Sequence, residues 1–356
     1  AGATTEEAIA IGMEKTGGII TSAGLIMILV FFGFALARLI VIKEFGLGMA
    51  IAIFIDASII RLMVVPALMK LFGNANWYLP KFLDTMKNKI AVVTGANSGL
   101  GFETAKALAT QGARVIMLSR SADKGQEALD KIFSATQNDQ LELLTVDLAS
   151  QASIRETGKL ILDKYPVIDT LVNNAGTWIS QHSLTEDGVE TMFAVNHIAY
   201  VLMSHVLYPA IRKAEDGRIV CVASDSHFQF KVNYADLNLT NKYHGLRAYA
   251  QSKGANVMFV SELHQRKPDA NVSSYAIQPG LVKTDIGVKR TNWLHALAWK
   301  IRRSGGVSPA EGALCQIFCA SAPEAKGQSG LYWDKCQPKP SAKYTYIEAD
   351  RAQLWE

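Results

Sequence analysis

The sequence has few cysteines. Only four occur among its 356 residues, and neither a C-x-x-C pair nor a histidine-rich run accompanies them: Cys221, Cys315, Cys319 and Cys336. Because structural zinc sites draw their ligands from such spacings, we predict no bound metal. Cys315 and Cys319 are one helical turn apart and could share an ion, but reduced, buried thiols, as in a cytosolic environment, are the better interpretation. The seven histidines have no ligand spacing either and are expected to be structural.

Charge is also scarce. Lysine and arginine number 36, and aspartate and glutamate 32, which gives a formal net charge of +4 spread along the chain. Nucleic-acid binding requires a basic patch or stripe, and the sequence has none, so we expect no nucleic-acid partner. Charged residues make up only 19% of the chain. Together with the positive mean hydropathy, this indicates apolar sequence beyond that of a soluble core, and the excess lies before residue 72.

A signal peptide is absent as well. The chain begins with Ala1 and lacks a charged segment followed by an apolar segment and a small-residue cleavage site. We therefore expect it to be the C-terminal part of a longer protein.

Two long apolar runs fill the beginning of the chain. Residues 17–37 carry no charge, and residues 45–69 are interrupted only by Asp56 and Arg61. With a rise of ~1.5 Å per helical residue, each run is about long enough to cross the ~30 Å hydrocarbon core of a bilayer. Two such lengths in tandem predict a transmembrane helical hairpin over 1–72, with soluble helices buried on all sides as the alternative.

The charges that flank these runs predict the orientation. A hairpin of two spans has both ends on one side of the membrane. The lysines that follow the second run are Lys70, Lys81, Lys87 and Lys89. Under the positive-inside rule this side is cytoplasmic, so we expect a multi-pass protein of the cell membrane with the rest of the chain in the cytoplasm. Arg38, Lys43 and Glu44 between the runs weaken the asymmetry.

The charges inside the second run are costly in hydrocarbon, so Asp56 and Arg61 are expected to face protein or water. They are five residues apart, which is about 140° around an α-helix, so an intrahelical ion pair does not follow. A structural contact with neighbouring helices and a role in proton transport both stay open.

Several segments of this region carry a family resemblance. They are Thr16-Gly-Gly-Ile-Ile-Thr-Ser-Ala-Gly, Gly46-Leu-Gly-Met, Asp56-Ala-Ser-Ile-Ile-Arg-Leu-Met-Val-Val-Pro and Asn76-Trp-Tyr-Leu-Pro. Residues 1 to about 80 thus resemble the last two transmembrane helices of the MmpL-type transporters of the RND superfamily. That family exports lipids or drugs through a larger helix bundle, so two helices carry no transport site. The resemblance implies either an anchor or the end of a transporter fused to an enzyme, whose remaining helices would be partners.

A linker, 73–87, leads to the stretch around which the rest of the chain is organised. Ile90 to Val93 is apolar and β-branched, which is typical of a buried parallel strand, and it runs into Gly95-Ala-Asn-Ser-Gly-Leu-Gly101. Helix formers follow from Phe102. Strand, glycine turn and helix open a βαβ nucleotide site, in which backbone N–H groups receive a phosphate. The spacing G-x-x-x-G-x-G differs from the dinucleotide fingerprint, so a simple tight turn is the alternative.

Five more strands alternate with helical patterns. They are predicted over 113–118, 141–146, 168–172, 217–222 and 272–277. This alternation predicts a Rossmann-like, doubly wound parallel α/β sheet over 88–356. In such a sheet, binding residues lie at the carboxyl ends of strands. The motifs that follow the strands are Ser119-Arg120, Asp147-Leu148, Asn173-Asn-Ala-Gly176, Ala223-Ser224 and Pro279-Gly280.

Arg120 bears on the choice of cofactor. An acidic residue at the end of the second strand usually holds the ribose 2′-hydroxyl of NAD, and none is present here. An arginine at this position could instead meet a 2′-phosphate, which favours NADP. A solvated surface arginine is the alternative.

Tyr249 and Lys253 form the candidate catalytic pair. Residues four apart share one face of a helix, so the phenol lies beside an ammonium group. A positive charge favours the phenolate, and such a tyrosine can protonate a carbonyl or deprotonate an alcohol. An ordinary exposed pair is the alternative. Tyr243 is a less suitable rival, because the residue four positions on is Arg247, which does not pass a proton readily.

Taken together, the glycine loop after Thr94, Asn173-Asn-Ala-Gly176, Asn196, Ser224, Tyr249-x-x-x-Lys253 and Pro279-Gly280 with Thr284 resemble the short-chain dehydrogenase/reductase family. The resemblance covers 87–356 and implies hydride transfer with a nicotinamide cofactor. It implies that Tyr249 is the acid/base and that Lys253 lowers its pKa and holds the nicotinamide ribose. Ser224 would polarise the substrate oxygen, and Asn196 would hold a relay water.

The resemblance, with Arg120, also implies a cofactor site. Its members are Gly95, Asn97, Ser98, Gly99, Leu100, Gly101, Arg120, Asp147, Leu148, Asn174, Ala175, Gly176, Tyr249, Lys253, Pro279, Gly280 and Thr284. The glycine loop would line the pyrophosphate, Asp147 and Leu148 would meet the adenine, and Thr284 would contact the nicotinamide carboxamide.

The segment between Ser224 and Tyr249 is longer than in compact members of the family. With His227-Phe-Gln-Phe, Ser121-Ala-Asp-Lys-Gly and Ser308-Pro-Ala-Glu-Gly, it is similar to the branch of retinol dehydrogenases and WW-domain oxidoreductases. Members of that branch typically use NADP(H) on lipophilic alcohols or carbonyls of retinoid, steroid or fatty-aldehyde type. Ser226 is a second candidate for the polarising hydroxyl.

Residues 288–303 are predicted to form a basic amphipathic helix, which would either close over the substrate as a lid or lie on an anionic membrane surface. The sequence therefore predicts a membrane-anchored NADP(H)-dependent oxidoreductase for a lipophilic substrate. The alternative is a non-catalytic NADP(H)-sensing domain attached to an RND-type lipid transporter. Whether the protein forms a homo-oligomer stays open.

Overall fold

The computed structural model describes residues 21–37, 39–72, 85–266, 269–283 and 305–356. The chain divides into two compact units, 1–81 and 82–356. Each is described by itself.

The first unit is a pair of apolar helices. The helix Thr21–Phe34 is followed by a continuous helix of three segments, α2 (Ile40–Phe54), the π-helix η1 (Ile55–Val64) and α3 (Val65–Phe72). The two helices approach closely at glycines: a side chain at Gly46 would meet the Phe31 carbonyl, and one at Gly24 would meet Ala57. Small residues at a helix contact are typical of membrane bundles. The stretch Ile40–Leu68 is long and apolar enough to cross a membrane, and most of its described side chains are exposed, whereas Gly46 and Ala50 are buried.

The π-helix explains the charged residues of the second apolar run. Arg61 Nε donates to Asp56 Oδ2 at 2.9 Å, so the two charges form an intrahelical pair. A π-helix bonds residue i to residue i+5, which brings residues five apart onto one face of the helix. The α-helical spacing assumed from the sequence placed them about 140° apart and could not predict this pair.

The second unit is built on an eight-stranded sheet with the order β3-β2-β1-β4-β5-β6-β7-β8. All neighbouring strands are parallel except β7 and β8. The strands are β1 (Ile90–Thr94), β2 (Arg114–Ser119), β3 (Leu141–Thr145), β4 (Thr170–Asn173), β5 (Gly217–Val222), β6 (Val272–Gln278), β7 (Leu331–Asp334) and β8 (Gln337–Pro338). The predicted Rossmann-like sheet is therefore confirmed, and β7 and β8 are additions to the six predicted strands.

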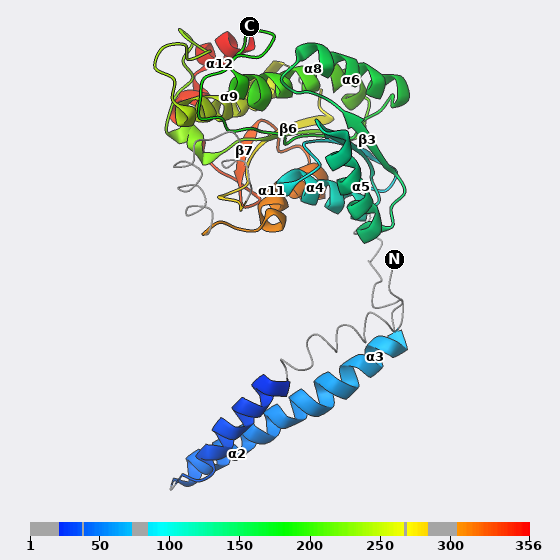
Figure 1. Ribbon diagram of the computed structural model, residues 1–356, viewed down its shortest axis with the longest axis vertical. Helices are drawn as coiled ribbons and strands as arrows, with labels where there is room; N and C mark the ends of the chain where they lie inside the picture. Colours follow the sequence, from blue (N-terminus) through cyan, green and yellow to red (C-terminus); the bar gives the residue numbers. More distant parts are fainter. Residues whose placement is uncertain (1–20, 38, 73–84, 267–268, 284–304) are drawn as a thin grey trace. The chain divides into compact units, whose positions relative to one another are not determined.

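Helices cover both faces of this sheet (Figure 1). One layer contains α4 (Gly99–Thr110), α5 (Ala122–Thr136) and α11 (Pro309–Ser321). The other contains α6 (Gln151–Lys164), α8 (Ala199–Ile211) and α9 (Gly245–Arg266), with α7 (Thr191–Phe193) and the π-helix η4 (Ala194–Ile198) leading into α8. The apolar helix Thr191–Ile211 is mostly buried in this core, as a central helix of a globular domain is.

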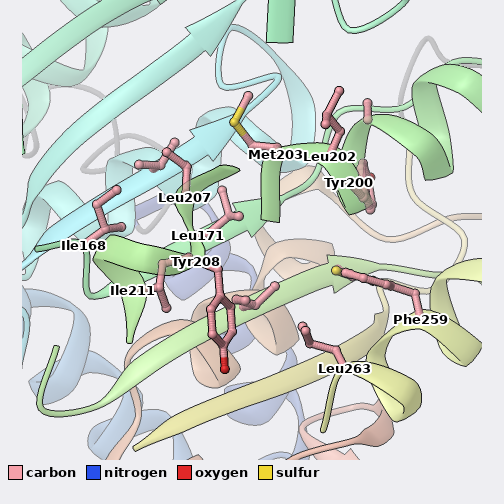
Figure 2. Packing of buried hydrophobic residues seen from close by; sticks show 14 of the residues in the cluster. Ile168, Leu171, Tyr200, Leu202, Met203, Leu207, Tyr208, Ile211, Phe259 and Leu263 are labelled. Atoms are coloured by element: carbon pink, nitrogen blue, oxygen red, sulfur yellow. The ribbon is translucent and has the colours of Figure 1, made fainter. Parts of the chain in front are cut away.

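Side chains of each strand alternate between the two cores. In β1, Val92 belongs to the core under α8 and α9, whereas Ala91 and Val93 belong to the core under α4 and α11. Figure 2 shows the first of these cores, where Leu171 of β4 lies near Met203 and Leu207 of α8. Strands buried on both faces explain the continuous apolar runs in the sequence.

The second unit begins before residue 88. Met86 is 1% exposed and belongs to the core, and Thr85 Oγ1 donates to Gln111 Oε1 at 3.0 Å. Residues 73–84 of the expected linker lie outside the described part of the chain.

The C-terminal helix α12 (Glu348–Trp355) is anchored on α9. The Trp355 ring stacks on Phe259 with centroids 5.8 Å apart. Arg351 is 6% exposed; its Nε donates to Glu262 Oε2 at 3.1 Å, and its Nη1 donates to the Tyr346 carbonyl at 2.9 Å. Glu262 is buried too, and it also accepts from Arg266 on the surface.

Replacing either of the two arginines that contact Glu262 should lower the free energy of unfolding by a different amount. Replacing buried Arg351 with methionine leaves a buried carboxylate short of its partner and should lower the free energy of unfolding by about 3 kcal/mol. Replacing the more exposed Arg266 with methionine should cost about 1 kcal/mol or less. Urea unfolding of the full chain in detergent micelles, followed by circular dichroism, measures both, and equal losses would contradict the assignment of Arg351 as the anchor.

Candidate active site

The glycine loop joins β1 to α4. Gly95 and Gly99 have φ angles of +66° and +58°, in the left-handed region that favours glycine. Ser98 is the N-cap of α4, and its side chain makes no capping bond. The N–H groups of the first helical turn, from Gly99 to Gly101, have no intrahelical acceptor, so they can receive an anion.

The loop is locked to the end of β4 at the point where the strand order reverses between β1 and β4. Thr94 Oγ1 accepts hydrogen bonds from the N–H groups of Asn174 and Ala175, both at 2.9 Å. Asn174 Nδ2 donates back to the Thr94 carbonyl at 2.8 Å. A Cβ atom at Gly101 would collide with the Gly95 carbonyl and with this amide. The residues present therefore fit a diphosphate-containing cofactor at the switch point of the sheet.

The other expected cofactor residues follow their strands at the same edge. Arg120 lies just after β2 and is exposed. Asp147 lies after β3 and is exposed, with its Oδ1 accepting from the Ala149 N–H at 3.0 Å, and Leu148 packs partly on the core. Gly280, after β6, has a φ angle of +80°. Thr284 and the predicted helix 288–303 lie outside the described residues.

The structure brings Ser224, Tyr249 and Lys253 together. Tyr249 and Lys253 lie on α9, with Lys253 Nζ 5.7 Å from the centroid of the Tyr249 ring. Ser224 follows β5, where its Oγ accepts from the Ser226 N–H at 3.2 Å, and its hydroxyl lies close enough to the Tyr249 phenol to lower the pKa of that group. Trp178, in the loop after β4, packs on Tyr249 with ring centroids 5.3 Å apart.

Burial shifts the pKa values of the pair in opposite directions. It raises the pKa of Tyr249 to about 12, against the lowering effect of the Ser224 hydrogen bond. It lowers the pKa of Lys253, which is 2% exposed, to about 7. Lys253 Nζ donates to the Val222 carbonyl at 2.7 Å rather than to the phenol. The expected lowering of the Tyr249 pKa is therefore not found in this geometry, and the phenol is protonated at neutral pH.

The side chain of Asn196 makes structural hydrogen bonds to the backbone of Thr177. It lies in the π-helix η4, where its Oδ1 accepts from the Thr177 N–H at 2.7 Å and its Nδ2 donates to the Thr177 carbonyl at 3.0 Å. These bonds fix the loop after Asn173-Asn-Ala-Gly176. The backbone carbonyl of Asn196 accepts from Asn256 Nδ2 at 2.8 Å.

The rival hydroxyls have different surroundings. Tyr243 Oη donates to the Ile179 carbonyl and to Glu190 Oε1, both at 3.2 Å, and burial raises its pKa, so this tyrosine is a structural residue. Ser226 Oγ is buried and has no hydrogen-bond partner among the described residues, whereas the Ser224 hydroxyl meets Tyr249. Ser224 is thus the better placed hydroxyl.

His227 supports Ser224 and was not predicted as a site residue. Its Nδ1 donates to the Ser224 carbonyl at 2.6 Å, and its Nε2 accepts from the Ala342 N–H at 3.1 Å. The ring is fully buried, and burial lowers its pKa, so it is neutral. Its partner lies 115 residues away in the sequence, so no local pattern predicts this role.

The cysteines are unpaired. Cys221, Cys315 and Cys319 are buried, and Cys336 is partly exposed. Among the described residues, no group of three potential ligands could hold a metal ion.

Comparison with known proteins identifies the families that the two parts of the chain match. Residues 89–295 match the model of the short chain dehydrogenase family. The chain belongs to this family. Residues 1–91 match the model of the MMPL family, so both resemblances are confirmed. As a short-chain dehydrogenase/reductase, the protein is an NAD(P)-dependent oxidoreductase.

Individual relatives agree with the predicted branch. This short-chain dehydrogenase is 35% identical to retinol dehydrogenase 12 of Mus musculus over 249 aligned residues. The alignment covers 70% of this chain and 78% of that protein. The chain is 35% identical over 279 residues to the WW domain-containing oxidoreductase of Pongo abelii, covering 75% of this chain and 66% of that relative, just under two thirds. A crystal structure of an uncharacterised protein from Mycobacterium paratuberculosis matches with a TM-score of 0.59 and 30% identity, over 76% of this chain and 91% of that one.

The fit of the glycine loop predicts the effect of a single methyl group. Gly101→Ala should raise the dissociation constant of the reduced nicotinamide cofactor about fivefold or more, because overpacking costs at least ~1 kcal/mol and displaces the loop. Gly305→Ala is the control, since an added Cβ there has no atom of the described residues within 4 Å. Fluorescence titration of the full chain measures both, and unchanged binding by Gly101→Ala would remove the glycine loop from the cofactor site.

Proposed function

We propose that this protein is a membrane-anchored oxidoreductase that transfers hydride between NADP(H) and a lipophilic alcohol or carbonyl of retinoid, steroid or fatty-aldehyde type. The observation that carries the proposal is the grouping of Ser224 and Tyr249 beside buried Lys253, on a frame whose glycine loop fits the cofactor. The hydride chemistry itself is supplied by the bound nicotinamide.

The residues divide the proton chemistry between them. The Ser224 hydroxyl donates a hydrogen bond to the substrate oxygen. Tyr249, protonated at neutral pH because burial raises its pKa to about 12, donates its proton to a carbonyl oxygen that is reduced. In the opposite direction the phenolate is needed, and a charged Lys253 beside it stabilises that form. Lys253 would also hold the nicotinamide ribose, and the Asn196 carbonyl would hold a relay water.

The preference for NADP(H) rests on Arg120. Its exposed guanidinium follows β2, at the position where an NAD site would carry an acidic residue. A guanidinium binds a phosphate through charge-assisted hydrogen bonds. Gly95 to Gly101 would line the pyrophosphate, Asp147 and Leu148 would meet the adenine, and Asn174 to Gly176 would lie along the cofactor. Pro279, Gly280 and Thr284 would contact the nicotinamide end.

A lipophilic substrate suits the surroundings of Tyr249. Trp178, Tyr243 and Tyr249 pack on an apolar cluster that includes Ile179, Met192 and Leu239. The name of retinol dehydrogenase 12 points to the same substrate class. We assign 1–72 to a membrane hairpin and the unit that includes Thr85 and Met86, with the predicted 88–356, to the catalytic domain. That domain would lie on the cytoplasmic side, where it would meet substrates dissolved in the bilayer.

The match of residues 1–91 to the MMPL family favours a second candidate, a domain that senses NADP(H) for an RND-type transporter without turnover. The simultaneous presence of Ser224, Tyr249 and Lys253 in one site argues for the enzyme, because a sensor would not need all three side chains.

Removal of the phenolic hydroxyl tests the mechanism. We expect Tyr249→Phe, as full chain in lipid vesicles, to lose turnover by about 10²-fold or more, because the proton donor is gone. NADPH oxidation is followed with retinal, long-chain aldehydes and a keto-steroid as substrates. Tyr243→Phe is the matched control and should retain turnover.

Two results would contradict the proposal. Full turnover by Tyr249→Phe with normal NADPH binding would refute the acid/base role. Tight NADPH binding by the unaltered protein without turnover of any of these substrates would favour the sensor.

The cofactor preference has its own test. Arg120→Ala should weaken NADPH binding by about 10- to 100-fold, the value of a hydrogen bond to a charged group, and leave NADH binding almost unchanged. Titration of both cofactors against the same variant provides the comparison. Equal losses for the two cofactors would separate Arg120 from the 2′-phosphate.

A further inference from the structure

Asn256 shares an acceptor with Lys253. The amide lies three residues after Lys253 on α9, on the same face of the helix, and is fully buried. Lys253 Nζ donates to the Val222 carbonyl at 2.7 Å, and Asn256 Nδ2 donates to the same oxygen at 3.2 Å. Asn256 Nδ2 also donates to the Asn196 carbonyl at 2.8 Å. One amide thus contacts both the carbonyl to which Lys253 donates and the carbonyl of Asn196.

A neighbouring histidine fixes the orientation of this amide. His197 Nδ1 lies 2.9 Å from Asn256 Oδ1. Because the Nδ2 hydrogens face two carbonyls, Oδ1 is the acceptor and His197 Nδ1 must be the donor. His197 is 2% exposed, and burial lowers its pKa to about 4, so the ring is neutral near pH 7. An amide turned by 180° would point its oxygen at both carbonyls and lose the histidine.

The shared acceptor affects how freely Lys253 can move. A buried carbonyl without a donor costs about 1–3 kcal/mol. If Lys253 were the only donor to the Val222 oxygen, turning Nζ toward another partner would incur that cost. Asn256 keeps the oxygen bonded whichever way Lys253 points, so the lysine loses one hydrogen bond and gains another.

We propose that Asn256 is a positioning residue for Lys253. Its amide holds the Val222 carbonyl, so that the ammonium group of Lys253 can turn to the nicotinamide ribose. The same amide orients the Asn196 carbonyl. A carbonyl oxygen accepts two hydrogen bonds, so the bond from Asn256 leaves one lone pair of the Asn196 oxygen for a water. His197 acts through Asn256. The inference rests on the proposed function, because it requires Lys253 to act on the cofactor.

The first experiment removes the amide while keeping its approximate volume. We expect Asn256→Leu, as full chain in lipid vesicles, to raise the dissociation constant of NADPH about tenfold and to lower the turnover number by a similar factor, since one hydrogen bond to the cofactor is weakened. The matched control is Asn138→Leu. Asn138 Nδ2 likewise donates to two carbonyls, those of Ala109 at 2.8 Å and Ala113 at 2.9 Å, far from the site.

The second experiment keeps the amide and changes its neighbour. His197→Phe removes the donor to Asn256 Oδ1 and should reproduce part of the loss, because the amide is then held only by its contacts with the two carbonyls. His197→Asn places an N–H near the position of Nδ1 and should restore at least half of that loss. This pair decides the question where Asn256→Leu does not fold.

A purely structural role predicts another pattern. In that case the melting temperature falls for both Asn256→Leu and Asn138→Leu, while the NADPH dissociation constant and turnover of folded protein stay at the level of the unaltered chain. That result, or equal NADPH binding by the two His197 variants, would overturn the inference. Failure of the proposed mechanism is seen separately, as full turnover by Tyr249→Phe, and the NADPH titrations still decide the role of Asn256.

Discussion

The hydrogen bonds that join the ends of β1 and β4 are the constraint on which the site depends. Thr94 Oγ1 accepts from two successive N–H groups in the loop after β4, and Asn174 donates back to the Thr94 carbonyl. These bonds close the switch point of the sheet and leave no room for a side chain at Gly101. Helix α4 begins where they place it, and α11 follows, because Gln316 Nε2 donates to the Leu100 carbonyl at 3.1 Å. The geometry of the glycine loop is thus determined by hydrogen bonds between side chains and backbone at one edge of the sheet.

The end of β5 positions the candidate catalytic residues Lys253 and Ser224 in a similar way. Lys253 Nζ donates to the Val222 carbonyl, and His227 Nδ1 donates to the Ser224 carbonyl. Both donors are buried, so neither is exchanged for water without cost. The same burial raises the pKa of the Tyr249 phenol and lowers that of the Lys253 ammonium. Burial thus favours the neutral form of both groups: it moves the pKa of Lys253 toward neutral pH and that of Tyr249 away from it.

Much of the fold follows from the sequence, because strands buried on both faces give unbroken β-branched runs and parallel strands bring the motifs after them to one edge. The six predicted strands and the proximity of Ser224, Tyr249 and Lys253 are of this kind. What could not be predicted depends on contacts between distant segments. His227 needs Ala342, and Asn256 needs His197 and Val222. The short strand β7 needs the edge of β6, and β8 needs the edge of β7. The sequence also left Tyr243 as a rival until its hydroxyl was seen to bond Glu190.

The two π-helices show why local periodicity was insufficient. Sequence reasoning places residues at α-helical spacing, and by that spacing Asp56 and Arg61 point in different directions. The π-helix η1 brings them to 2.9 Å, so two charges that hydrocarbon would penalise become one neutral pair. In η4 the widened turn carries Asn196, whose backbone carbonyl accepts from Asn256. In both units, the departure from α-helical bonding occurs where polar groups in an apolar helix require a partner. Because the π-helical turn depends on the polar partner, the pattern of apolar residues before and after it does not predict where it occurs.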